Sequence, residues 1–290
     1  MTTPAESSLR AVLEGGARRL AEAGVPDPLV DAELLLAHVL AESRGAVQVA
    51  AIRGDAIDPA PHDAFDAVVA RRAQREPLQH ITGVAPFRHL ELLVGPGVFV
   101  PRPETEMVAQ LGIDALRADA SPRPVGVDLG TGSGAIALAL ATEVPHAEIH
   151  AVEKSPDAHA WTRRNIARSG AEVHLVLGDL ADALRELDGT VSVVVSNPPY
   201  VPDDAIPRDP EVRLHDPAAA LYGGPDGLDV VRVLSVTAAR LLRPGGLLVI
   251  EHGEWQGAPV RELLTADGWR QAATHPDLTL RDRATTAVRA

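Results

Sequence analysis

The sequence predicts an α/β protein: a doubly wound, Rossmann-like parallel sheet preceded by a small helical bundle. From Val125 onward, short apolar stretches alternate with helical patterns, which is typical of β-α-β units in a sheet covered on both faces. From about Ser7 to Arg75 the pattern is helical and gives no strand signal. We expect a β-hairpin to join the two parts.

The expected sheet has five short apolar strands. They are Val125–Leu129, Glu148–Glu153, Val173–Leu177, Val191–Ser196 and Leu247–Glu251. Gly134–Glu143 reads as a helix, and another helix starts at Ser155, which is followed by Pro156 at the first helical position. A further helix face ends at Leu241, before Pro244-Gly245-Gly246.

Prolines divide the helical part of the chain. Val25–Pro28 breaks it before a second helix, and Asp55–Pro61 breaks it before a third. After the third helix the residue pattern changes from helical to strand-like. Phe87–Val94 and Val98–Val100 read as strands joined by a Gly95–Gly97 turn. We therefore expect a helical domain over 1–80, a connecting hairpin over 81–108 and a sheet domain over 109–290.

Composition excludes several classes of protein. The 290 residues include no cysteine, which excludes disulfides and thiolate metal sites. With 40 acidic and 27 basic residues, the net charge of −13 disfavours binding to duplex nucleic acid. The longest apolar run, Ala135–Ala141, is too short for a membrane helix, and the first twenty residues lack the apolar core of a signal peptide. We expect a cytoplasmic protein without a membrane partner.

A glycine-rich loop follows the first strand, where ligands of such sheets bind. The stretch reads Asp128-Leu129-Gly130-Thr131-Gly132-Ser133-Gly134, and the residues between Gly130 and Gly134 are called the glycine loop below. Gly130, Gly132 and Ala135 fit the dinucleotide pattern G-x-G-x-x-A. The pattern D-x-G-x-G-x-G of S-adenosylmethionine loops fits better, because it also uses Asp128 and Gly134. The candidate cofactor-binding residues here are Asp128, Gly130, Thr131, Gly132, Ser133 and Gly134.

The next two strand ends offer further cofactor contacts. Glu153 ends the second strand, and its carboxylate can accept hydrogen bonds from both ribose hydroxyls of either cofactor. After the third strand, Asp179 can accept from an adenine amine, with Leu180 against the ring; as a helix cap, Asp179 has an ordinary structural alternative.

The fourth strand ends in Asn197-Pro198-Pro199-Tyr200, called the lip below. Two consecutive prolines have fixed φ and no backbone donors, so they make a stiff segment. Their carbonyl oxygens and the Asn197 side-chain oxygen are acceptors for an incoming NH₂ group, and Tyr200 offers a flat face to a planar substrate. A nicotinamide enzyme has no evident need for this group of acceptors.

The lip resembles that of the methyltransferases that modify amino groups of adenine, cytosine or glutamine. Further stretches narrow the resemblance to bacterial protein-(glutamine-N5) methyltransferases, which modify peptide chain release factors. These stretches are Glu76–Gly83, Pro101–Glu106, Glu251-His252-Gly253 and Gln256-Gly257. The resemblance covers residues 76–290 by motif, and the helical domain by size and texture only.

The resemblance implies a class I methyltransferase sheet and S-adenosyl-L-methionine as cofactor. It also implies in-line transfer of a methyl group to the glutamine of a Gly-Gly-Gln loop in a release factor. Asn197 and the Pro198 carbonyl would be the catalytic acceptors, with Pro199 and Tyr200 completing the substrate contacts and Asn197 also touching the cofactor. The helical domain would help to grip the protein substrate. The alternative is an adenine-N6 nucleic-acid methyltransferase, which the acidic charge opposes.

The chemistry needs no base, since the methylated nitrogen loses its proton to water, and no metal. None of the eleven histidines shows a metal-ligand spacing. We interpret Arg102, Glu104 and Glu106 as structural groups, namely ion pairs and acids at a helix start. We expect a monomer.

The sequence departs from the family pattern in two places. Asp216-Pro217 usually reads Glu-Pro, which keeps the charge. Leu280 stands where glycine is usual, which leaves the shape of the last turn open.

Overall fold

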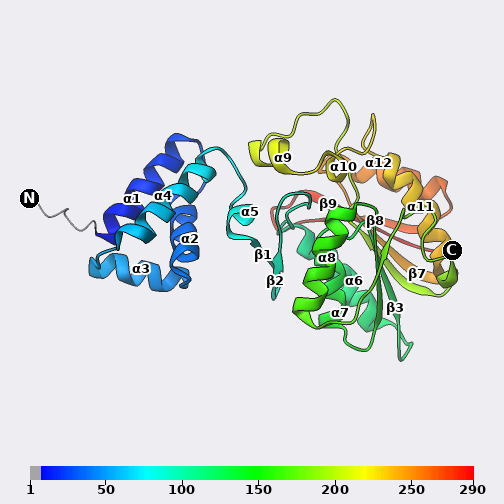
Figure 1. The fold of residues 1–290 in the computed structure, drawn as a ribbon. Coiled ribbons are helices and arrows are strands. Elements are labelled where there is room, and N and C mark those ends of the chain that lie inside the picture. The colour runs from blue at the N-terminus through cyan, green and yellow to red at the C-terminus, as the bar shows by residue number, and fades with distance from the viewer. Residues whose placement is uncertain (1–7) are drawn as a thin grey trace, which may run out of the picture. The chain divides into compact units, whose positions relative to one another are not determined.

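The structure is a computed structural model that describes residues 8–290. The chain divides into two compact units (Figure 1). The first unit runs to Gly83 and also includes Pro207–His215, whereas the second unit consists of Val84–Ile206 and Asp216–Ala290. A segment from the second half of the chain thus packs with the helical part, which the sequence pattern did not indicate.

The first unit is a bundle of short helices. They are α1 (Leu9–Glu22), α2 (Pro28–Leu40), α3 (Arg44–Arg53), α4 (Pro59–Ala73), α5 (Leu78–Thr82) and α9 (Pro210–His215). Proline stands in the first turn of α2 and α4, as the breaks predict. The separate helix α3 was not predicted: Ala41 ends α2 with a φ of 53°, and Ser43 then caps α3. The expected start at Ser7 lies outside the described residues.

Within the described part of the chain, no single helix has the length and apolar character needed to cross a membrane. The pair α2 and α3, bent by 99°, reaches that length and composition only when both helices are counted together.

Glu211 fastens the segment that carries α9 to the bundle. Its Oε1 accepts from Arg72 Nη1 at 2.7 Å and from Arg75 Nε at 2.8 Å, and its Oε2 accepts from Arg75 Nη2 at 2.6 Å. Arg72 also donates to the carboxylate of Asp31. Burial by itself would raise the pKa of Glu211, but the hydrogen bonds from Arg75 and Arg72 outweigh burial and lower that pKa to about 2.

We expect this attachment to weaken when Glu211 loses its charge. Because its folded-state pKa lies below the ordinary value of about 4.3, its stabilisation is complete above about pH 5 and is lost as the pH falls toward 2. Glu211→Gln should lower the local opening free energy by on the order of 1–2 kcal/mol after allowance for screening. Hydrogen–deuterium exchange over residues 207–215 measures this, with the exposed Glu172→Gln as control. Equal exchange in both variants would show that Glu211 does not hold the segment.

The connecting hairpin consists of β1 (Val84–Phe87) and β2 (Leu90–Leu93), which pair antiparallel. The predicted strand Val98–Val100 is therefore wrong. A turn does lie at Gly95–Gly97, where the Val98 N–H donates to the Gly95 carbonyl at 3.4 Å, but it follows the hairpin and does not join its strands. The stretch expected to be one long strand folds back at Arg88, which adopts a φ of 54° and whose N–H donates to a carboxylate further along the chain. A left-handed arginine gives no turn signal in the sequence, whereas the glycines do.

The second unit contains a seven-stranded sheet in the order β5-β4-β3-β6-β7-β9-β8. Its strands are β3 (Val125–Leu129), β4 (Glu148–Glu153), β5 (His174–Leu177), β6 (Val191–Ser196), β7 (Leu242–Glu251), β8 (Arg270–Pro276) and β9 (Asp282–Val288). Strands β3 to β7 are parallel, which confirms the doubly wound prediction. β7 begins before the expected Leu247, with an irregular register against β6. The antiparallel strands β8 and β9 were not predicted.

Helices cover both faces of this sheet (Figure 1). α6 (Thr105–Ala118), α7 (Ala135–Glu143) and α8 (Pro156–Ser169) lie on one face, and α11 (Asp229–Leu241) and α12 (Gly257–Ala266) lie on the other; the short helices α10 (Ala218–Leu221) and η1 (Arg185–Leu187) lie in connections. Successive residues of β6 point to opposite faces: Val193 and Val195 pack with α6 and α7, whereas Val194 packs with α11. Burial on both faces explains why the parallel strands are uniformly apolar.

The turn between β8 and β9 keeps a backbone that suits glycine, although Leu280 occupies it. Leu280 has a φ of 62°, and its side chain is exposed. The Asp277 carboxylate holds the turn by accepting from the N–H groups of Thr279 and Arg281. The shape left open by the sequence is thus a left-handed turn.

We expect Leu280→Gly to stabilise the protein. Relief of left-handed strain contributes about 1–2 kcal/mol, and the chain entropy of glycine offsets about 0.5–1 kcal/mol of it. In thermal unfolding, the midpoint of Leu280→Gly should be slightly higher than that of the parent. The midpoint of Leu280→Ala should be unchanged, because alanine keeps the strain. An equal rise in both variants would attribute the effect to the exposed side chain instead.

Candidate functional site

The glycine loop and the lip leave the sheet from neighbouring strands. β3 and β6 pair in parallel, with Asp128 beside Val195. At the ends of these strands, Ser196 Oγ donates to the Leu129 carbonyl at 2.6 Å. The glycine loop and the lip each begin at the next residue. The structure therefore brings the two predicted motifs together at the carboxyl edge of the sheet, where ligands of doubly wound folds bind.

The glycine loop needs its three glycines for two different reasons. Gly130, Gly132 and Gly134 have φ values of 77°, 59° and 86°, a region that other residues rarely adopt. A Cβ on Gly130 or Gly132 would meet nothing within 4 Å, so the loop has an open side. A Cβ on Gly134 would lie 2.9 Å from Thr162 Cγ2, so there the loop packs closely on α8.

Asp128 lies beneath the loop. Its Oδ2 accepts from Thr131 Oγ1 at 2.6 Å and from the Ala137 N–H at 3.0 Å, so it ties the loop to the first turn of α7. Burial raises the pKa of Asp128 to about 7, against the opposing effect of these two hydrogen bonds. Its Oδ1 is buried and has no hydrogen-bond partner among the described residues.

Two residues of α8 support the loop from behind. Thr162 Oγ1 donates to the Gly132 carbonyl at 2.6 Å, and Asn165 Nδ2 donates to the Ser133 carbonyl at 2.9 Å. Asn165 Oδ1 also accepts from the Leu93 N–H, which links the hairpin to the loop. The sequence analysis missed both residues. The sequence signal that could have found them is their spacing: Thr162 and Asn165 lie on the same face of α8 as Ala158, and this face is buried.

Glu153 is placed where the sequence predicts it, at the end of β4. Its Oε2 accepts from the Gly132 N–H at 2.8 Å, and its Oε1 accepts from the Ser155 N–H at 2.7 Å. Only 8% of the residue is exposed. Each carboxylate oxygen keeps a second lone pair for another donor, so the side chain can serve both the loop and a ligand.

Asp179 and Leu180 have clear structural roles of their own. Asp179 Oδ1 accepts from the Ala181 N–H at 3.0 Å within a turn, so it makes the bond of the capping alternative without capping a helix. Its Oδ2 pairs with Lys154 Nζ at 2.8 Å. The Leu180 side chain is half-buried against the core on the α11 face of the sheet. Their contacts with an adenine ring stay predictions.

The lip is anchored at both ends. Asn197 Nδ2 donates to Thr105 Oγ1 at 3.3 Å, at the start of α6. At the other end, Gln256 Nε2 donates to the Tyr200 carbonyl at 2.9 Å, and Tyr200 Oη donates to Glu251 Oε1 at 3.4 Å. Pro198 is buried between these anchors. The motifs around Glu251 and Gln256 thus contact the lip.

Sequence comparisons match this chain to two domain families over residues 11–219 and to relatives over nearly its whole length. A PrmC N-terminal domain family matches residues 11–83, and a Methyltransferase small domain family matches residues 89–219. A release factor glutamine methyltransferase of Streptomyces coelicolor is 53% identical over 279 residues, covering 94% of this chain and 95% of the relative. The chain belongs to the family of release factor glutamine methyltransferases.

Other members of this methyltransferase family are nearly as similar. The enzyme of Mycolicibacterium smegmatis is 47% identical, covering 97% of this chain and 98% of the relative, and that of Bifidobacterium longum is 45% identical, covering 96% and 98%. Among solved structures, a methyltransferase from Pyrococcus furiosus matches with a TM-score of 0.52 and 20% identity, covering 70% of this chain and 90% of that one. A Thermus thermophilus 16S rRNA methyltransferase, solved with AdoMet and guanosine, also has a TM-score of 0.52 and 20% identity, covering 71% and 50%. These two structures confirm the class I methyltransferase fold.

The lip of this methyltransferase runs close against two glycines. A Cβ on Gly223 would lie 2.5 Å from the Pro199 carbonyl oxygen, and a Cβ on Gly227 would lie 2.2 Å from the Tyr200 carbonyl oxygen. The second would also lie 2.7 Å from Gln256 Nε2, which holds that carbonyl. The two contacts with carbonyl oxygens are with backbone, which cannot move aside as a side chain can.

We expect Gly227→Ala to displace the lip and to reduce methyl transfer more than tenfold. Gly170→Ala is the matched control: Gly227 and Gly170 have φ values of 74° and 69°, but a Cβ on Gly170 meets nothing within 4 Å. Initial rates of transfer and thermal midpoints should be compared for the two variants. Similar rates in both would mean that the contact with the lip has no effect on the reaction.

Arg102 and the two nearby acids have the structural roles predicted for them. Arg102 Nη2 pairs with Asp216 Oδ2 at 2.6 Å, and the Asp216 side chain is buried. Glu104 stands at the N-cap of α6, and Glu106 in its first turn accepts from the Arg88 N–H at 2.8 Å. The aspartate at position 216 therefore keeps the ion pair that a carboxylate provides there.

Three possible metal ligands gather at the opposite edge of the sheet, where β4 and β5 begin. The nitrogen and carboxylate atoms of Glu148, His150 and His174 lie within 4.8 Å of one another. The two imidazole rings, however, stack at 4.6 Å with an interplanar angle of 27°, and His150 Nε2 bonds Glu148 Oε1 at 2.9 Å. Ring lone pairs lie in the ring planes, so stacked rings do not direct them at one point. The arrangement favours a hydrogen-bonded stack.

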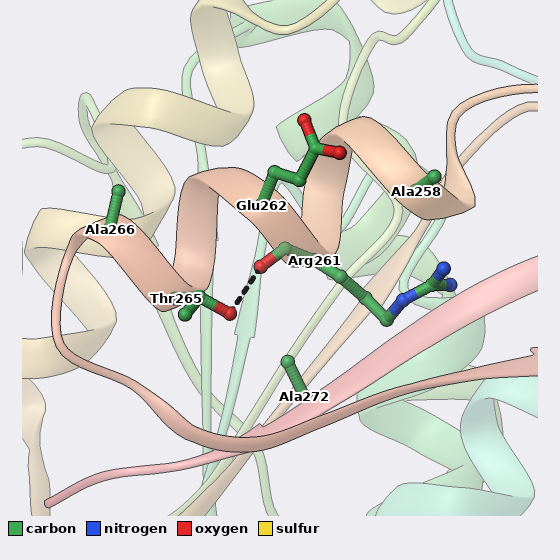
Figure 2. Close-up of a pocket in the computed structure, with 6 residues that line it drawn as sticks. All are labelled: Ala258, Arg261, Glu262, Thr265, Ala266 and Ala272. Carbon is green, nitrogen blue, oxygen red and sulfur yellow. Dashed lines mark hydrogen bonds between the residues drawn. The ribbon is translucent and has the colours of Figure 1, made fainter.

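A surface hollow on α12 and β8 does not belong to the site (Figure 2). β8 is the outermost strand, at the far end of the strand order from β3 and β6. Thr265 Oγ1 donates to the Arg261 carbonyl at 2.7 Å, as Figure 2 shows, and the Arg261 guanidinium donates to Thr274. The Thr265 hydroxyl and the Arg261 guanidinium are thus both engaged with other groups of the protein.

Proposed function

We propose that this chain uses S-adenosyl-L-methionine to methylate N5 of the glutamine in the Gly-Gly-Gln loop of peptide chain release factors. The proposal rests chiefly on one observation: the lip and the glycine loop start side by side, at the ends of the adjacent strands β6 and β3. A cofactor held over the glycine loop and an amide held by the lip would then be neighbours. Membership of the family supports the choice of substrate.

The residues around the glycine loop fit the cofactor. Gly130 and Gly132 leave the side of the loop open, and Glu153 keeps lone pairs for the ribose hydroxyls. The buried, partnerless Oδ1 of Asp128 suits a cofactor that carries positive charge, because such a charge favours the ionised carboxylate. S-adenosyl-L-methionine supplies a methyl group that its sulfonium already activates.

The lip would orient the glutamine amide. Asn197 Oδ1 accepts one amide hydrogen and the Pro198 carbonyl accepts the other, so the nitrogen lone pair faces the methyl group. Positive charge builds on this nitrogen during transfer, so both acceptors bind more strongly in the transition state than in the ground state. Alignment of this kind contributes up to about 7–11 kcal/mol. The proton leaves to water, and no side chain acts as base.

The first unit would help to bind the protein substrate, because a small carboxamide offers little surface for recognition. Flanking glycines in the substrate would let its loop reach the lip. We further propose that the enzyme acts as a monomer in the cytoplasm, on release factors and not directly on nucleic acid. The net charge of −13 supports the last point.

Transfer of labelled methyl groups tests the proposal. The purified chain is incubated with labelled S-adenosyl-L-methionine in three separate reactions, one with a release factor, one with DNA and one with RNA. We expect label in the release factor alone, and none in a release factor whose loop glutamine is replaced by glutamate. Label only in nucleic acid would overturn the proposal in favour of an adenine-N6 methyltransferase. Calorimetric binding of a nicotinamide dinucleotide but not of S-adenosyl-L-methionine would overturn it in favour of an oxidoreductase.

A further inference from the structure

Asn197 has a neighbour that fixes which end of its amide faces the substrate. Its Nδ2 donates to Thr105 Oγ1 at 3.3 Å. Thr105 is the first residue of α6 and is only 4% exposed, so the residue is largely shielded from bulk water. A hydroxyl that accepts from Asn197 must direct its own hydrogen to another acceptor.

Glu251, at the end of β7, is the carboxylate that lies beside this hydroxyl. It is 1% exposed, and its Oε1 accepts from Tyr200 Oη at 3.4 Å. Its Oε2 is buried and lacks a partner at full hydrogen-bond geometry among the described residues. The Thr105 hydroxyl is the neighbouring donor that favours the ionised carboxylate. Glu251 therefore bonds Tyr200 at one end of the lip and lies beside Thr105, which accepts from Asn197 at the other end.

We propose that Thr105 and Glu251 are positioning residues, which hold Asn197 with its oxygen toward the substrate amide. The inference rests on the proposed role of Asn197. A carboxylate can only accept hydrogen bonds, so it sets the direction of the whole series of hydrogen bonds: Asn197 Nδ2–H donates to Thr105 Oγ1, and the Thr105 hydroxyl donates to Glu251. With this direction fixed, Asn197 presents Oδ1, which can accept from a carboxamide NH₂ group. A reversed Asn197 would present its own NH₂ group to another NH₂ group.

The charge on Glu251 depends on groups from several elements. Burial is the main reason that the pKa of Glu251 is raised to about 7, and the negative charge of Glu104 acts in the same direction. The Thr105 and Tyr200 hydroxyls and the positive charge of Arg283 on β9 oppose this rise. Because the ionised form of Glu251 fixes the direction of these hydrogen bonds, methyl transfer should be fastest above about pH 7 and should slow as Glu251 gains a proton.

Substitutions at Thr105 test the inference. Thr105→Val removes the hydroxyl with little change of shape, and Thr105→Ser keeps the hydroxyl. At saturating cofactor and release factor, we expect kcat to fall at least tenfold in Thr105→Val and less than threefold in Thr105→Ser. The dissociation constant for S-adenosyl-L-methionine should stay unchanged in both. Equal kcat values for Thr105→Val and Thr105→Ser would overturn the inference.

A double variant separates positioning from general destabilisation. If Thr105 acts only through Asn197, Thr105→Val should cost nothing more in an Asn197→Ala background. A further loss of similar size there would show that Thr105 acts independently, and would overturn the inference. If Asn197→Ala alone retains full transfer, the proposed function of the lip fails instead, so the two failures are distinguishable.

The pH profile tests Glu251. Between pH 6 and 8, kcat of the parent should rise with a midpoint near 7, measured at saturating cofactor so that Asp128 does not contribute through binding. Glu251→Gln keeps an acceptor oxygen but has no ionisation, so we expect measurable transfer with a flat profile over the same range. A rise near pH 7 that persists in Glu251→Gln would overturn the assignment of the ionisation to Glu251.

Discussion

Asn197→Ala is expected to lose methyl transfer by about 10²–10³-fold while it retains cofactor binding. The loss follows from removing an acceptor whose bond to the amide strengthens as positive charge builds on nitrogen. The backbone of the lip should stay in place, because Gln256 holds the Tyr200 carbonyl and Pro198 and Pro199 keep their fixed φ. Transfer to a release factor under single-turnover conditions measures the effect, with calorimetry for the cofactor.

Asn197→Asp is the matched variant. Aspartate keeps an acceptor oxygen for the amide but loses the donor to Thr105 Oγ1, so we expect an intermediate rate. Transfer by Asn197→Ala within threefold of the parent would contradict the role assigned to Asn197. Loss of cofactor binding in Asn197→Ala would instead show that the main contact of this residue is with the cofactor and not with the substrate amide.

Glu153→Ala is expected to weaken binding of S-adenosyl-L-methionine by about 10²-fold or more. Two hydrogen bonds from ribose hydroxyls to a carboxylate contribute about 1.5–3 kcal/mol each. The substitution also removes the acceptor of the Gly132 N–H, so the glycine loop loses one of its ties. Calorimetry with S-adenosyl-L-methionine and with its product, S-adenosyl-L-homocysteine, should show the same loss, because the two share the ribose.

The exposed acid Glu172 provides the control for charge. Glu172→Ala removes the same charge from the same unit, on a stretch outside the carboxyl edge of the sheet, and should bind the cofactor like the parent. Glu153→Gln should lie between Glu153→Ala and the parent, because it keeps one acceptor oxygen. Unchanged affinity in Glu153→Ala would mean that the ribose binds elsewhere.

The parallel part of the sheet could be predicted because its strands are buried on both faces and therefore read as apolar runs. Val125–Leu129 and Val191–Ser196 match the observed β3 and β6 in full. The strands β8 and β9 lie beyond β7 at the sheet edge and carry polar residues such as Arg270 and Asp282. Half-polar strands give a weak periodic signal, so this antiparallel pair was missed.

In the candidate site, too, some residues could be predicted from the sequence and others could not. The glycine loop and the lip are contiguous in sequence, so their residue types alone indicated their chemistry. Their supports come from distant positions: Thr105 reaches Asn197 across 92 residues, and Asn165 reaches Ser133 across 32. Each is an ordinary polar residue on a helix until the fold shows its partner. Glu211 is similar, because only tertiary packing shows that it meets Arg72 and Arg75.

The central claim is that the lip presents oxygens to a carboxamide beside the glycine loop. A crystal structure of the chain with S-adenosyl-L-homocysteine and a peptide containing Gly-Gly-Gln tests it most directly. We expect the glutamine nitrogen at about 2.7–3.2 Å from both Asn197 Oδ1 and the Pro198 carbonyl oxygen, with the product sulfur on the far side of that nitrogen from these oxygens. A peptide glutamine bound away from the lip, or an Asn197 oxygen turned away from the amide, would contradict the account.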